Sequence, residues 1–220
     1  MHGKVRMIFQ DPYSSLNPCM TINEMLTETL RAKEKQIKFD QKERKKDRQR
    51  QIEQMLTRVG LSSLDGKRYP RELSGVQRQK AAIARALLLE PELLICDEAV
   101  SSLDAATRTQ ILDLLLRVVK EKKIACLFIS HDMALIRRIS HRTGVLYKGT
   151  LAECAKTRDL CRDPWHPYTK ALLDSVMPAD PLKARKQKVP AVHEGKSEGG
   201  CPYFGSCGYK MEMCKDAAPE

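Results

Sequence analysis

Three short, mainly apolar segments of the chain each end abruptly in polar residues. Apolar runs bounded in this way are typical of strands that are buried in a parallel sheet. The segments, each with the polar residues that follow it, are 5–9 before Gln10, 93–96 before Asp97 and Glu98, and 124–129 before Ser130 and His131.

The stretch between the last two segments has apolar residues at helical spacing. They are Ile111, Leu112, Leu115, Val118 and Val119. Strand, helix and strand in this order predict a right-handed parallel crossover and therefore an α/β domain. Ligands of such sheets bind beyond the carboxyl ends of the strands, so the three polar endings predict one composite site.

Outside this core the pattern is helical. Between 21 and 73 it predicts long, basic helices, in which Ile52, Met55, Leu56 and Val59 form an apolar stripe and Gly60 ends a helix. Another helix is predicted over 167–176, where proline occupies the first turn. The expected parts are 1–20 (first strand and loop), 21–90 (helical subdomain), 91–157 (α/β core), 158–181 (C-terminal helix) and 182–220 (basic, cysteine-containing tail).

Composition narrows the class of protein. With 220 residues, of which 42% are hydrophobic and 30% charged, the chain can bury one core or a core plus a small lobe. No window approaches the run of about 18 apolar residues that a membrane span needs. The first residues do not resemble a secretory signal, so a cytoplasmic location is expected.

Much of the net charge of +11 lies in one run. Between Arg31 and Arg50 there are ten Lys or Arg residues against four Asp or Glu. Almost no aromatic residues accompany them, and nucleic-acid bases need such side chains for stacking. A solvated helix face is therefore favoured over a nucleic-acid interface.

Two adjacent carboxylates, Asp97 and Glu98, follow the second apolar segment. Neighbouring carboxylates repel each other, and a divalent cation relieves that repulsion in phosphoryl transfer, where one acid supports magnesium and a second group orients the attacking water. The alternative is a strand that ends in two solvated acids.

Upstream, Ser74 and Gly75 open an alanine- and leucine-rich helix that extends to about Leu87. A helix start leaves backbone N–H groups free and favours an anion. In isolation, this segment is better explained by Ser74 acting only as an N-cap.

Taken together, these segments resemble the motifs of ABC ATPases. In order they are similar to the Q-loop, signature, Walker B, D-loop and switch histidine of that family. Two further stretches, 11–18 and 165–169, resemble the ATPase subunits of dipeptide, oligopeptide and nickel importers. The five motifs are Phe9-Gln10-Asp11-Pro12, Leu73-Ser74-Gly75-Val76-Gln77, Leu94-Ile95-Cys96-Asp97-Glu98, Ser101-Ser102-Leu103-Asp104 and Ile129-Ser130-His131-Asp132.

The resemblance implies an incomplete P-loop NTPase-like parallel sheet with an inserted helical subdomain, and ATP and magnesium as cofactors. It implies that Gln10 reaches the magnesium and the nucleophilic water, and that Asp97 supports the magnesium. Glu98 would be the general base, and His131 would contact the γ-phosphate.

The signature residues have a different implied role. Ser74, Gly75 and Gln77 would act in trans on ATP held by a second subunit, while Asp104 would help to couple the two sites. Val76 departs from the family pattern, which has glycine there, and a β-branched side chain hinders close approach to phosphate.

A phosphate loop of the form Gly-x-x-x-x-Gly-Lys-Ser/Thr is absent from the sequence. Gly195-Lys196-Ser197 imitates its end, but Pro190 stands where the first glycine belongs. In the family this loop precedes the Q-loop. The expectation is an amino-terminally truncated chain that binds and hydrolyses little ATP by itself.

The eight cysteines do not show a disulfide pattern. Cys201, Cys207 and Cys214 lie in the tail, where similar ATPases carry a cysteine-containing extension that has been associated with an iron–sulfur cluster. A cluster on these three residues would require a fourth ligand, such as Cys161 or His193.

The leading hypothesis is therefore an ATPase subunit that powers peptide import at the cytoplasmic face of the inner membrane. Its partners would be permease subunits, a second ATP-binding subunit in a homo- or heterodimer and, indirectly, an extracytoplasmic solute-binding protein. Two alternatives are an inactive module that lends its signature motif in trans, and a soluble ABC protein that acts on nucleic acid.

Overall fold

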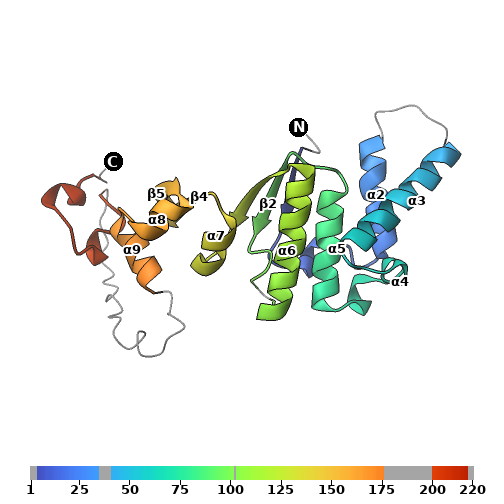
Figure 1. Ribbon diagram of the computed structural model, residues 1–220, viewed down its shortest axis with the longest axis horizontal. Coiled ribbons are helices and arrows are strands. Elements are labelled where there is room, and N and C mark those ends of the chain that lie inside the picture. Colours follow the sequence, from blue (N-terminus) through green and yellow to red (C-terminus); the bar gives the residue numbers. More distant parts are fainter. Residues whose placement is uncertain (1–3, 35–40, 102, 176–199, 218–220) are drawn as a thin grey trace. The chain divides into compact units, whose positions relative to one another are not determined.

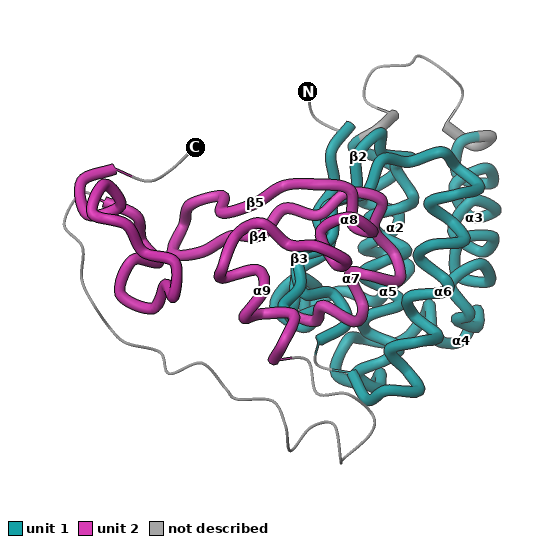
Figure 2. The backbone as a smooth tube through the Cα atoms, turned by 60° about the vertical axis from the view of Figure 1, so that its left-hand side comes forward, with its two compact units in different colours: residues 1–131 teal, residues 132–220 magenta. Residues whose placement is uncertain are grey.

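The computed structural model describes residues 4–34, 41–101, 103–175 and 200–217. The chain divides into two compact units, residues 1–131 and residues 132–220 (Figure 2). No helix in the described ranges is both long enough and apolar enough to cross a membrane.

Unit 1 (residues 1–131) is built around three parallel strands in the order β1-β2-β3. They are β1 (Val5–Ile8), β2 (Leu93–Asp97) and β3 (Ala125–Ile129). The central strand is the most buried, because Leu94 and Cys96 are fully covered. Ile8 pairs with Cys96, and Asp97 with Ile129, so the strands end level with one another. The three predicted strands and the α/β class are confirmed.

Two long helices cover this sheet and lie side by side (Figure 1). Helix α6 (Ala105–Lys122) connects β2 to β3, as the helical spacing predicted, and it buries Ile111, Leu112, Leu115 and Val118. Helix α5 (Gly75–Leu87) packs against β1. Its alanine-rich face is buried, and small side chains allow a helix to approach a strand closely.

The helical part of unit 1 follows the first strand. Its main helices are α2 (Ile22–Glu34) and α3 (Gln41–Arg58), with the short turns α1 (Pro12–Ser15), α4 (Ser63–Gly66) and η1 (Pro70–Glu72). The predicted stripe of Ile52, Met55, Leu56 and Val59 is buried. Gly60 adopts φ +71° just beyond α3, which is the left-handed conformation that ends helices.

Unit 2 (residues 132–220) contains a β-hairpin that the sequence pattern did not predict. Strands β4 (Arg142–Tyr147) and β5 (Thr150–Lys156) are antiparallel and joined by Lys148 and Gly149, both with positive φ. Two positive φ values are typical of tight hairpin turns. The remaining elements are α7 (Met133–Ile139), α8 (Thr157–Arg162), α9 (Pro167–Asp174), η2 (Phe204–Ser206) and η3 (Glu212–Lys215).

The helix predicted over 167–176 is confirmed as α9, which ends at Asp174. His166 caps its first turn, since its Nδ1 accepts a hydrogen bond from the Tyr168 backbone N–H at 3.0 Å. Burial lowers the pKa of His166, and the nearby Glu153 carboxylate opposes this effect. The neutral imidazole is therefore the form that the fold favours.

Candidate functional site

The carboxylate of Glu98 contacts two side chains that are distant in sequence. Gln10 Nε2 donates to Glu98 Oε2 at 2.7 Å, and His131 Nδ1 lies 2.9 Å from Oε1. The three residues follow β1, β2 and β3 respectively. The structure thus brings together the three residues predicted to be catalytic, at the carboxyl edge of the parallel sheet.

The backbone of Glu98 leaves β2 in a sharp turn. Its φ is +45°, a conformation that costs energy for residues other than glycine. Two sets of hydrogen bonds hold it: the Glu98 N–H donates to the Ile129 carbonyl at 3.0 Å, and Ser101 donates to the Glu98 carbonyl through its N–H and hydroxyl. The neighbouring strand and loop therefore fix the direction of the carboxylate.

Ligands can reach this group from solvent, because the His131 side chain is 74% exposed and that of Glu98 is 26% exposed. Asp97 is the last residue of β2 and is partly buried. The Asp97 carboxylate and the Gln10 amide carry the oxygen donors that magnesium prefers. Since no three His, Cys, Asp or Glu residues in the described ranges are grouped to hold a metal ion, their role as magnesium ligands stays a prediction.

The start of α5 is a complete capping box. Ser74 Oγ accepts from the Gln77 N–H at 3.2 Å, and Gln77 Oε1 accepts from the Ser74 N–H at 2.9 Å. A Cβ added to Gly75 would meet no atom within 4 Å, so the space beside it is open. The N-cap role of Ser74 is visible, and the role of Ser74, Gly75 and Gln77 toward a nucleotide in trans stays a prediction.

Asp104 caps α6. Its Oδ1 accepts from the Thr107 N–H at 3.1 Å, and hydrogen bonds from the side chain and backbone of Thr107 hold the pKa of Asp104 below its ordinary value. An ionised carboxylate at a helix start is favoured by the helix dipole. Its predicted part in coupling two sites is not tested by this geometry.

Helix α5 also anchors both loops of the Glu98 site, which the sequence did not reveal. Gln79 is 1% exposed, and its Nε2 donates to the Ala99 carbonyl at 2.6 Å, next to Glu98. Arg85 donates to the carbonyl of Ser15, the last residue of the turn α1 that follows Gln10, at 2.6 Å. Burial lowers the pKa of Arg85. Only the folded chain identifies these contacts, because their partners are backbone atoms.

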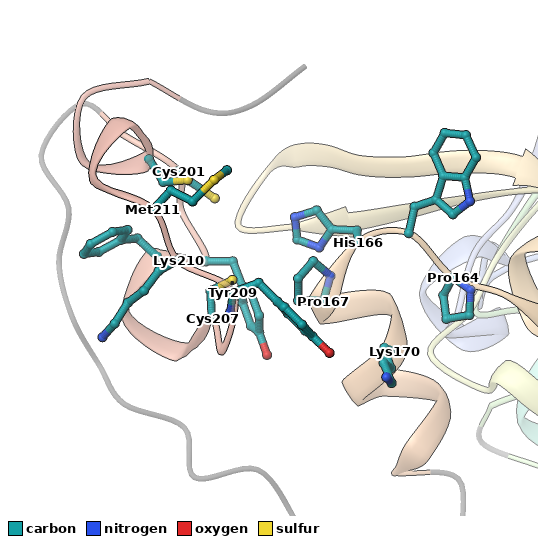
Figure 3. A pocket seen from close by; sticks show the side chains of 13 residues that line it. Pro164, His166, Pro167, Lys170, Cys201, Cys207, Tyr209, Lys210 and Met211 are labelled. Carbon is teal, nitrogen blue, oxygen red and sulfur yellow. Dashed lines mark hydrogen bonds between the residues drawn. The ribbon is translucent and has the colours of Figure 1, made fainter.

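The tail cysteines line a cavity of about 330 Å³ with His166 and several aromatic residues (Figure 3). Cys201 and Cys214 are buried against Tyr203, and Cys207 packs beside them. No metal-holding group of three or more ligands is present in the described part of the chain. The predicted cluster on Cys201, Cys207 and Cys214 therefore stays a prediction, and in this structure the three residues pack into an aromatic core.

The two candidates for a fourth ligand are likewise untested. Cys161 packs instead against the apolar cluster of Met133, Val145 and Leu160. His193 lies outside the described residues.

Comparison with known proteins identifies the family. Residues 1–101 match the family model described as ABC transporter, and residues 152–214 match the one described as Oligopeptide/dipeptide transporter, C-terminal region. The chain belongs to the oligopeptide/dipeptide family of ABC transporter ATP-binding proteins. The resemblance read from the five motifs is therefore confirmed.

Individual relatives agree with this assignment. The oligopeptide transport ATP-binding protein OppF of Bacillus subtilis is 42% identical over 88% of this chain, which spans 63% of OppF. The glutathione import ATP-binding protein GsiA of Pectobacterium atrosepticum is 42% identical over 86% of this chain, which spans 29% of GsiA. The chain thus spans less than two thirds of the length of these relatives.

A solved structure supports the fold. The ATP-binding cassette MJ0796, whose dimer was determined in a post-hydrolysis state with ADP and Pi, is 27% identical, with a TM-score of 0.59. The similarity covers 70% of this chain and 63% of MJ0796. The parallel-sheet core of this chain is thus an ABC ATPase fold.

Proposed function

We propose that the protein provides the hydrolytic carboxylate of an ATPase that powers oligopeptide or dipeptide import at the cytoplasmic face of the inner membrane. The observation that carries this proposal is the contact of Glu98 with both Gln10 and His131, at 2.7 and 2.9 Å. The proposed partners are permease subunits and a second ATP-binding subunit. A solute-binding protein would deliver the peptide from outside.

The chemistry assigned to these residues is proton transfer and charge stabilisation. Glu98 accepts a proton from the attacking water, and the Gln10 amide orients that water. When bound, ATP supplies the phosphoryl group, and magnesium neutralises part of its charge. Asp97 and the Gln10 amide oxygen are the residues that would hold magnesium.

The His131 ring limits how the site accepts an anion. Its Nδ1 is engaged with Glu98, so contact of its Nε2 with a phosphate oxygen requires a proton on that nitrogen as well. His131 is then suited to stabilise negative charge that develops during transfer.

The phosphate groups of ATP need a further binding element, because the 220 residues contain no Gly-x-x-x-x-Gly-Lys-Ser/Thr motif. We expect the purified 220-residue chain to show background hydrolysis. When it is reconstituted with a peptide permease and a second ATP-binding subunit, Glu98→Gln should abolish its contribution to phosphate release. Robust hydrolysis by the chain alone that is lost in Glu98→Gln would refute the need for an added phosphate loop. Unchanged phosphate release by the assembled transporter that carries Glu98→Gln would refute the role of Glu98.

A second candidate function is that of a subunit that lends the start of α5 to ATP held by an intact partner. The complete capping box and the open space at Gly75 favour it. Gly75→Ala fits this space, so the variant should fold normally. We expect it to lower hydrolysis by the partner subunit, measured with Glu98→Gln present in this chain. Unchanged hydrolysis in a normally folded Gly75→Ala variant would exclude this function.

A further inference from the structure

Unit 2 contains a second cavity, of about 550 Å³, that belongs to none of the motifs described above. Its lining includes four cationic side chains from four elements: Arg137 in α7, Arg142 in β4, Lys156 in β5 and Arg158 in α8. A cavity of this size is within the range of small-molecule sites.

The cations converge because of the strand register. Arg142 and Lys156 are directly opposite each other in the β4–β5 pair. Like charges at opposed positions destabilise a hairpin, so this pairing has a cost that nothing in the register relieves. Arg158 follows Lys156 by two residues and adds a third positive charge at the same end of the hairpin.

Carboxylates in the described residues do not balance these charges. None of the four cations forms an ion pair there, and the contact of Arg142 Nη2 with Cys154 Sγ at 3.7 Å is with an uncharged group. Two acids in the same elements, Glu153 in β5 and Asp159 in α8, have other partners. Glu153 accepts the backbone N–H groups of Trp165 and His166, and Asp159 lies 4.0 Å from Arg162.

Two further polar residues lie in the lining. Ser140 is partly buried beside the cations, and its hydroxyl forms no hydrogen bond within the described chain. His141 also lines the cavity. Its backbone carbonyl accepts the Thr157 N–H at 3.0 Å, which fixes the start of β4 against the start of α8. Guanidinium groups, ammonium and hydroxyl at one place form a donor set that suits phosphate oxygens.

We propose that this cavity binds an anion that carries about two phosphate charges or more, either the diphosphate group of a soluble metabolite or the phosphomonoester of a lipid headgroup. Three guanidinium groups offer paired N–H donors, and phosphate oxygens accept such pairs. The site lies in unit 2 and is formed without the Glu98 group of unit 1.

The experiment titrates inorganic pyrophosphate into the full 220-residue chain and follows heat or the ³¹P signal. We expect saturable binding that weakens with added salt. The Arg142→Glu/Arg158→Glu variant should bind at least about tenfold more weakly. Lys210→Glu, which reverses an exposed cation of the same unit outside the cavity, should bind like the parent. Arg142→Gln provides a milder variant if the double reversal does not fold.

A second arm distinguishes the two sources of phosphate. Phosphatidylcholine vesicles with and without phosphatidate are sedimented with the chain, and pyrophosphate is added as competitor. Phosphatidate-dependent sedimentation that pyrophosphate reverses assigns the site to a headgroup; pyrophosphate binding without sedimentation assigns it to a soluble ligand. The proposal fails if neither probe binds, or if Lys210→Glu and the cavity variants lose binding equally.

Discussion

The sheet edge of unit 1 and the basic cavity of unit 2 both gather polar side chains that are distant in sequence. At the edge, the carboxylate of Glu98 has side-chain partners at hydrogen-bond distance, Gln10 and His131. In the cavity, Arg142 stands opposite Lys156 without a carboxylate from the described residues to balance them. A ligand at the edge must replace existing hydrogen bonds, whereas a ligand in the cavity would supply charge that the protein lacks.

The largest expected effect is on hydrolysis, and it tests the contact of His131 with Glu98 at the sheet edge of unit 1. In the reconstituted transporter, His131→Ala should lower hydrolysis by about 10²-fold, because one stabilising donor is lost. His131→Gln should retain more activity than His131→Ala, since an amide can still donate to Glu98. Phosphate release measures both. Activity that survives in His131→Ala would show that its contact with Glu98 is structural; Gln54→Ala, at an exposed position of α3, is the control.

A smaller effect is expected from the support of this edge by α5. Gln79→Leu leaves the Ala99 carbonyl without its buried donor, so the free energy of unfolding should fall by about 1–3 kcal/mol. Denaturant unfolding measures the loss. The matched variant Gln54→Leu, at an exposed position of α3, should change stability far less. Equal losses would mean that the 2.6 Å bond of Gln79 contributes nothing specific.

In the basic cavity of unit 2, removal of a charge should raise the stability of the protein instead of lowering it. Lys156→Gln relieves the repulsion with Arg142, so it should stabilise unit 2 by about 0.2–1 kcal/mol at low salt. Thermal unfolding should show that this gain disappears as salt screens the charges. Arg162→Gln removes a cation that lies near Asp159 and should give no gain. A salt-independent loss in Lys156→Gln would contradict the comparison.

The smallest effect concerns pH. Because burial lowers the pKa of His166, its contribution to stability is present above the ordinary pKa of 6.5 and is lost as the pH falls through the lowered value in the folded state. Protonation of Nδ1 also removes the acceptor for the Tyr168 N–H. Exchange of this amide, corrected for its intrinsic rate, should accelerate below about pH 6.5. His166→Asn, a cap that does not titrate, should remove the pH dependence.

Much of unit 1 could be predicted from local pattern. The apolar runs that became β1, β2 and β3 are buried, and the carboxyl ends of parallel strands meet at one edge. Gln10, Glu98 and His131 could therefore be expected to lie together before any contact was known. The apolar pattern does not predict the hairpin of unit 2, although Lys148-Gly149 marks its turn. Its strands carry exposed leucines and charges and therefore form no apolar run.

The sequence by itself determined the family, the parallel core and the residues gathered around Glu98, because these depend on motif order and on strand direction. Tertiary structure alone decided three other features. It placed Gln79 and Arg85 on backbone carbonyls, buried the tail thiols among aromatic rings, and set Arg142 opposite Lys156. Each of these features depends on which other segment of the chain packs against the residue, and the residue type at one position does not specify that segment.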